Sequence, residues 1–280
     1  MKFDLHCHSY YSDGSHPPDF LMHRAVQNGV THLSITDHDC IEVYKQELAI
    51  PTELKLVSGV EISCAWDNQE IHIVGLGIDV NDQSLNSLLA AQQASRTRRT
   101  TEIAHNLAKI TQADLAGYFE SLPCISRTRT HIAHFLVAEG ICKNHQQAFK
   151  KYLSRSGKIY SPASWCSLEE AISSIDNAGG IAVLAHPSRY PYTRKKLIRL
   201  IENFKESGGS AIETAYSNLS PITQKNLELL CEETSLYASA GSDFHSAENR
   251  WTDIGKFHRF AEGKKNAIWN HPKWHFTDNA

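Results

Sequence analysis

The chain has 280 residues, of which 41% are hydrophobic and 21% charged, as in a globular protein large enough for one α/β domain with an insertion. Its net charge of −3 excludes a global positive field, so a nucleic-acid partner would need a local basic patch or bound metals. No apolar run approaches the roughly 20 residues that span a membrane, and the start lacks the apolar core of a signal peptide. We therefore expect a cytoplasmic protein that does not contact membranes.

The first half of the chain alternates strands with helices and then changes character. We expect strands over residues 3–8, 32–36, 54–63 and 70–76. Pro17-Pro18 predicts the start of a first helix, and a short helix is expected over 41–48. Residues 82–155 are helical in pattern, with no strong strand between 76 and 159. This segment is the candidate insertion, with its core at about 100–160.

Regular alternation resumes after this segment. Ser167 and Glu170 have the spacing of a capping box that opens a helix. Strands are expected over 181–185, 211–215 and 236–242, with helices over 193–207 and 221–234. Seven strands, most followed by a helix, predict a mainly parallel sheet that is either open or closed into a barrel.

Histidines and carboxylates gather at the predicted strand ends. His6 and His8 are two residues apart and so point the same way in a strand, as do Asp243 and His245. Polar residues at the carboxyl ends of strands line the functional face of α/β folds. The full set of candidate metal ligands is His6, His8, Asp13, His38, Glu61, His72, His186, Asp243 and His245. Such a set suits two or three Mn, Fe or Zn ions with a bridging carboxylate, which favours hydrolysis at phosphorus.

Six motifs carry a family resemblance. DLHCHSYYSDG, LSITDHD, GVEIS, IHIVGLG, LAHPSRY and GSDFH resemble, in this order, those of the PHP (polymerase and histidinol phosphatase) superfamily of metal-dependent phosphoesterases. YLSRSGKIYSP and WCSLEEAI look most similar to the RNase AM (TrpH-like) branch. That branch includes 5′→3′ exoribonucleases on 5′-phosphorylated RNA and phosphatases of 3′,5′-bisphosphonucleotides (pAp). The resemblance implies a distorted (β/α)7 barrel from residues 1–99 and 161–280, with a helical insertion at 100–160 that forms part of the substrate pocket.

The resemblance also implies roles for the candidate ligands. Three divalent ions are expected, with Mn²⁺ favoured and Fe or Zn as alternatives. The first would be held by His6, His8 and Asp243, with Glu61 bridging to a second that His72 and His186 complete, and the third by Asp13, His38 and His245. A metal-bound hydroxide held by His6, His8, Glu61 and Asp243 would attack phosphorus. By the same resemblance Arg129, His131 and Lys158 would bind substrate phosphate. Arg189, which lies just past the expected metal ligand His186, is a further candidate for binding it.

Several alternatives stay open at this point. One of Asp37 and Asp39 is either a partner that orients an imidazole or surface charge. Arg96, Arg98 and Arg99 are interpreted as a solvated helix face. The leading hypothesis is a hydrolase of nucleotide phosphoesters that acts, as a monomer, on nucleotides or short 5′-phosphorylated RNA. The alternatives are a small-metabolite phosphatase such as histidinol phosphatase, and a non-catalytic regulatory PHP module.

Overall fold

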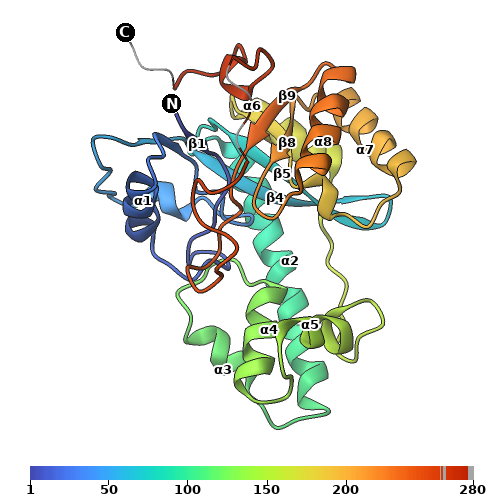
Figure 1. Ribbon diagram of the computed structural model, residues 1–280. Helices are drawn as coiled ribbons and strands as arrows, with labels where there is room; N and C mark the ends of the chain where they lie inside the picture. The colour runs from blue at the N-terminus through green and yellow to red at the C-terminus, as the bar shows by residue number, and fades with distance from the viewer. Residues whose placement is uncertain (259, 261–262, 277–280) are drawn as a thin grey trace.

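The computed structural model describes residues 1–258, 260 and 263–276 (Figure 1). Its strands form two sheets. The smaller, parallel sheet has the order β1-β2-β3, with β1 at Phe3–Asp4, β2 at His32–Leu33 and β3 at Lys55–Leu56. The larger has the order β6-β4-β5-β7-β8-β9, with β4 at Gly59–Trp66, β5 at Gln69–Leu76, β6 at Cys166–Ser167, β7 at Ile181–Leu184, β8 at Ala211–Ala215 and β9 at Tyr237–Ala240.

Backbone hydrogen bonds join the small sheet to the large one at both ends. Beyond β1 and β9, the Asp243 N–H donates to the His6 carbonyl at 2.8 Å. Beyond β2, the Asp39 N–H donates to the Glu61 carbonyl of β4, also at 2.8 Å. The mixed α/β class is thus confirmed, whereas a closed barrel is not established by this pairing. The segments that follow β1, β2 and β9 therefore come together beside β4, near Glu61.

The strand pairing agrees with a mainly parallel arrangement but differs in detail. Five of the seven pairings among the described residues are parallel, and β5 runs antiparallel to both β4 and β7. The single strand expected over 54–63 is wrong. It divides into β3 and β4 because the backbone changes partner: the Val57 N–H bonds Leu33 of the small sheet, and the Ser58 carbonyl bonds Gly77 beside the large one.

The helices fill the connections between these strands. They are α1 (Pro18–Gln27), α2 (Gln83–Ala108), α3 (Leu115–Glu120), α4 (Arg129–Ala138), α5 (His145–Ala148), α6 (Leu168–Asn177), α7 (Arg194–Glu206) and α8 (Pro221–Glu233). The predicted capping box is confirmed, since the Ser167 hydroxyl accepts from the Glu170 N–H and the Glu170 carboxylate accepts from the Ser167 N–H. The helix expected over 41–48 is a single 3-10 turn, Glu42–Lys45.

The two largest of five hydrophobic clusters in the described residues show how the chain packs. One lies between the large sheet and the helices beside it, and includes Ile62, Ile73 and Ile175. The other lies within α2–α5 and includes Leu107 and Ile132, and Figure 1 shows these helices projecting below the sheets. Burying one such side chain contributes about 1.5–3 kcal/mol, so each cluster stabilises its own part of the chain.

The expected domain limits stay a prediction. Helix α2 continues without a break through the expected boundary between residues 99 and 100. Within the segment assigned to the barrel, residues 259, 261–262 and 277–280 lie outside the described part of the chain. None of the helices in the described residues is both long and apolar enough to cross a membrane.

Candidate metal centre

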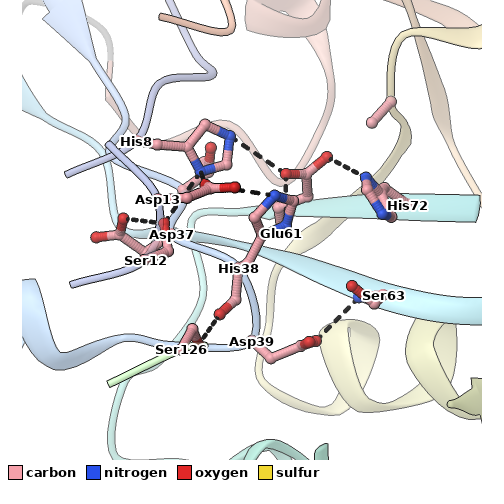
Figure 2. A network of polar contacts seen from close by, with 12 residues as sticks. His8, Ser12, Asp13, Asp37, His38, Asp39, Glu61, Ser63, His72 and Ser126 are labelled. Atoms are coloured by element: carbon pink, nitrogen blue, oxygen red, sulfur yellow. Dashed lines mark hydrogen bonds and ion pairs between the residues drawn. The ribbon is translucent and has the colours of Figure 1, made fainter. Parts of the chain in front are cut away.

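Glu61, buried in β4, lies at the centre of the candidate site. Five imidazoles approach within 3.3 Å of its two carboxylate oxygens, those of His6, His8, His38, His72 and His186. Figure 2 shows three of these rings, His8, His38 and His72, directed at the carboxylate. Imidazoles from several strands therefore converge on one bridging group.

The other three candidate ligands extend this cluster. Asp243 Oδ1 lies 3.2 Å from His8 Nε2, and Asp13 Oδ1 lies 3.3 Å from His245 Nε2. Four sets have ligand atoms that all lie within 4.8 Å of one another: His8, Asp13, His38 and His245; His6, Glu61 and His186; His6, His8 and Asp243; and His38, Glu61 and His72. The structure thus brings all nine candidates together, and the sets overlap as expected for ions that share ligands.

Three residues of the site have a left-handed backbone, with φ of 46° at Asp39, 30° at His186 and 51° at Asp243. Such conformations cost about 1–3 kcal/mol for residues other than glycine, and they persist where the surroundings hold them. The backbone N–H groups supply that hold. The His186 N–H donates to Glu213 at 2.6 Å, and the Asp243 N–H donates to the His6 carbonyl. These turns aim the two ligand side chains into the cluster.

The residues present fit divalent metal ions. Buried polar atoms without a hydrogen-bond partner in the described residues include Asp13 Oδ1, His38 Nδ1 and Glu61 Oε2. Leaving such an atom unsatisfied costs about 1–3 kcal/mol, and a coordinated ion would remove that cost. Imidazole nitrogen with carboxylate oxygen is a donor set that Mn, Fe and Zn accept.

The electrostatics of the cluster keep its carboxylates ionised. Burial raises the pKa of Glu61, but attraction to His38, His6 and other imidazoles outweighs it and holds that pKa well below its usual value. Burial likewise opposes the lowering of the Asp243 pKa, and here Arg189 is the largest of several attractions that outweigh it. At His186, burial dominates and lowers the pKa. At His8 and His72 burial lowers the pKa, but the neighbouring carboxylates outweigh it and raise the pKa to about 10, so a bound cation would displace protons from these rings.

The amino-terminal part of the chain decides the family. The PHP domain profile matches residues 4–164. The chain belongs to the PHP domain family. It is 41% identical over 262 residues to the 5′-3′ exoribonuclease Rnm of Escherichia coli (strain K12), an alignment that covers 91% of this chain and 88% of the relative. It is 36% identical over 261 residues to a 3′,5′-nucleoside bisphosphate phosphatase of Chromobacterium violaceum, covering 91% and 90%.

A solved structure agrees with these relatives. An amidohydrolase from Chromobacterium violaceum, with bound sulfate and no metal, superposes with a TM-score of 0.84 at 34% identity, covering 94% of this chain and 93% of that one. The names of the two sequence relatives are those of phosphoester hydrolases. The predicted family and the predicted enzyme class are confirmed.

Carboxylates outside the ligand set orient several imidazoles. Asp37 accepts from the Ser12 hydroxyl at 2.6 Å, and that hydroxyl lies 3.3 Å from His8 Nδ1 (Figure 2). Asp37 therefore acts on an imidazole through Ser12, while Asp39 instead accepts from the Ser63 N–H at 2.9 Å. Both carboxylates are buried, so the alternative interpretation of either residue as a surface charge is wrong. Glu213 contacts His6 Nδ1 at 2.7 Å and was missed, although an acidic residue inside the apolar run 211–215 was a signal.

The four expected phosphate ligands occupy different places. Arg129 lines a cavity of about 110 Å³ beside Asp13, His38 and His72, and its Nη2 lies 3.0 Å from Glu70 Oε1. Arg189 pairs with Asp243 and lies over the Tyr216 ring at 5.5 Å. The His131 Nδ1 accepts from the Thr128 N–H at 3.1 Å and so caps α4. The side chain of Lys158 is exposed, and its backbone N–H bonds the Lys151 carbonyl at 3.1 Å. Their binding of phosphate stays a prediction.

The solvated face expected on α2 is wrong at two of its three arginines. Arg98 is exposed, but Arg96 and Arg99 retain only 5% and 7% of their accessible surface. Arg96 donates to Asp39 at 2.8 Å, and Arg99 Nη1 lies 3.5 Å from Glu70 in the wall of the cavity. These side chains face inward because α2 packs against the polar site, where the carboxylates of Asp39 and Glu70 pair with the two guanidinium groups.

Proposed function

We propose that this protein is a divalent-metal-dependent phosphoesterase on nucleotides. It acts as a 5′→3′ exoribonuclease on short 5′-phosphorylated RNA, as a phosphatase of 3′,5′-bisphosphonucleotides, or as both. The observation that carries the proposal is the set of overlapping ligand groups around Glu61, which opens onto a cavity with Arg99 and Arg129 in its wall. The named activities of the two sequence relatives support the substrate class.

We propose three ions, with Mn²⁺ preferred. His6, His8 and Asp243 suit one ion, and Asp13, His38 and His245 suit another, with His8 within reach of both. Glu61, His72 and His186 would complete the third. Bound divalent ions neutralise charge at phosphorus and lower the pKa of water.

The protein's own groups would bind and orient the substrate. A second cavity, of about 440 Å³, shares Arg99, Arg129 and Glu70 with the small one and also carries Tyr160 and Trp165. Guanidinium groups bind phosphate in a planar fork, and aromatic rings offer a platform on which a base stacks. The two adjacent cavities thus suit a nucleotide whose phosphate lies toward the metal ligands.

The domain organisation belongs to the same proposal. We propose that residues 1–99 and 161–280 form a distorted (β/α)7 barrel, and that residues 100–160 form an insertion that completes the substrate pocket. The separate hydrophobic cluster of α2–α5 and the position of Arg129 support this. A monomer in the cytoplasm is the accompanying expectation.

The test is hydrolysis with purified protein and added Mn²⁺. We expect mononucleotides from a 5′-phosphorylated RNA oligonucleotide, phosphate from adenosine 3′,5′-bisphosphate, and little product from a 5′-hydroxyl oligonucleotide. Glu61→Gln should abolish all product, since it removes the shared anionic ligand. Wild-type protein that binds Mn²⁺ but releases neither product would overturn the proposal, and preferential turnover of histidinol phosphate would redirect it to small metabolites.

A further inference from the structure

Glu213 has an unusual environment for an acidic residue. It lies in the middle of β8, a strand whose five residues are all buried, and its side chain is 2% exposed. Burying a carboxylate is costly unless its oxygens are paired. The partners of Glu213 are the side chain of His6 and the backbone of His186. Its role should therefore follow from what it does to these two residues.

Each carboxylate oxygen of Glu213 has a different partner. Oε1 lies 2.7 Å from His6 Nδ1, and Oε2 accepts from the His186 N–H at 2.6 Å. His6 follows β1 and His186 follows β7, so one side chain connects two distant parts of the chain. Both contacts are shorter than an ordinary N–H···O bond of about 2.9 Å, as befits an ionised acceptor.

The two contacts set two different features of the ligands. An ionised carboxylate can only accept, so His6 Nδ1 carries the hydrogen and Nε2 is left facing Glu61 and Asp243, at 3.3 Å and 3.4 Å. At His186 the contact holds the N–H of a residue with φ of 30°. That turn places His186 Nε2 3.0 Å from Glu61. Glu213 thus orients one ligand through its ring and the other through its backbone.

We propose that Glu213 is a positioning residue that orients His6 and His186, which are ligands of the two ions that Glu61 bridges. The inference rests on the proposed metal dependence. The three ligands form one of the four sets identified above. Among the described residues, the hydrogen bonds of the Glu213 side chain go to His6 and His186, and not to His38 or His245 of the set around Asp13. It should therefore control the affinity of some metal ions more than that of others.

Glu213→Gln is the sharpest substitution because it keeps the shape and removes one acceptor. If the amide oxygen faces His6, the amide NH2 meets the His186 N–H. If the amide is reversed, it opposes the Nδ1 hydrogen of His6 and favours the tautomer whose Nε2 cannot bind metal. Loss of such an orienting partner lowers metal affinity by about 10–100-fold. We expect that loss for the Mn²⁺ sites that use His6 and His186, with the affinity of the site around Asp13 unchanged.

The measurement is calorimetric titration of metal-free protein with Mn²⁺, which needs no substrate. Glu170→Gln is the matched control, since Glu170 also accepts a backbone N–H at 2.7 Å but belongs to the cap of α6. An equal loss in every class of sites, or unchanged Mn²⁺ affinities with only a lower free energy of unfolding, would overturn the inference. If wild-type protein binds Mn²⁺ but hydrolyses no phosphoester, the proposed function fails while this result still stands.

A second measurement reads the His6 ring of the wild-type protein and does not depend on how the Glu213 variant folds. Nitrogen NMR of histidine-labelled, Mg²⁺- or Zn²⁺-loaded protein reports which ring nitrogen carries hydrogen. The expected result is an Nδ1–H on His6, assigned by its loss in His6→Gln. An Nε2–H on His6 in the loaded protein would contradict the proposed orientation.

Discussion

Replacing Arg96 by methionine tests the buried network on which the candidate site rests. The Arg96 guanidinium lies 2.7–2.8 Å from Asp39 Oδ2 and donates to the Ser63 hydroxyl at 2.8 Å. Asp39 is 1% exposed and has a left-handed backbone next to His38. The substitution keeps most of the side-chain volume but leaves the Asp39 charge without its cation.

The expected cost follows from that burial. Removing one partner of a buried ion pair costs about 3–5 kcal/mol, because the remaining charge is desolvated and unpaired. The variant keeps two hydrogen bonds to Asp39 Oδ1. One comes from the Ser63 N–H at 2.9 Å and the other from Gln92 Nε2 at 3.2 Å. They place the expected loss nearer the lower figure. Asp39→Asn in the same chain should recover part of it, because the unpaired charge is then absent.

Urea unfolding of the metal-free protein measures this loss. Arg98→Met is the matched control, because Arg98 lies on the same helix with an exposed side chain, and it should change the free energy of unfolding by at most about 0.5 kcal/mol. A loss for Arg96→Met no larger than that of Arg98→Met would refute the reasoning. It would mean that Arg96 is solvated, as its sequence context first indicated.

Three further predictions follow from other parts of the structure. Burial raises the pKa of Asp253, but hydrogen bonds from Arg24 and Lys256 lower it to about 2. This contribution to stability is present above the unfolded pKa of about 3.9 and is lost as pH falls through about 2. Arg24→Gln should therefore lower stability at neutral pH by at most about 1 kcal/mol, and the difference should vanish in acid; a constant difference would contradict this assignment. Mn²⁺ at a hundredfold excess over its Kd should stabilise chelator-treated protein by about 2.7 kcal/mol per independent site. This stabilisation should appear as a rise in Tm that Glu61→Gln largely removes. An unchanged Tm in the wild-type protein would exclude a metal centre here. Ser167→Ala should cost about 1 kcal/mol through loss of the α6 cap without changing Mn²⁺ affinity, and an altered affinity would show that the cap and the site are coupled.

Some features of the site could be predicted because they depend on local spacing. Two histidines at positions i and i+2 of a strand point the same way, and His6 and His8 do so whatever surrounds them. Asp243 and His245 also reach the site, but they lie beyond β9 and Asp243 has φ of 51°, so strand alternation does not explain their direction. Apolar strands that end in such residues implied that both ends meet, and the hydrogen bond between the Asp243 N–H and the His6 carbonyl confirms that meeting.

Other features depend on which segments meet, and no local pattern records that. The chain passes from β3 to β4 without a break in apolar character, and only the change of partner at Val57 and Ser58 divides it. Arg96 has the spacing of an exposed charge, yet it is buried because α2 crosses the polar site. Glu213 looked like an isolated acid in an apolar strand until His6 and His186 were seen beside it.

The sequence by itself therefore determined the family, the α/β class and the candidate ligands, since these follow from residue types and short spacings. Only the tertiary structure decided which buried charges orient those ligands. The physical reason is that a buried charge is tolerated only where a distant segment supplies its partner. For Arg96, Asp39 and Glu213, that partner lies 27 to 207 residues away along the chain.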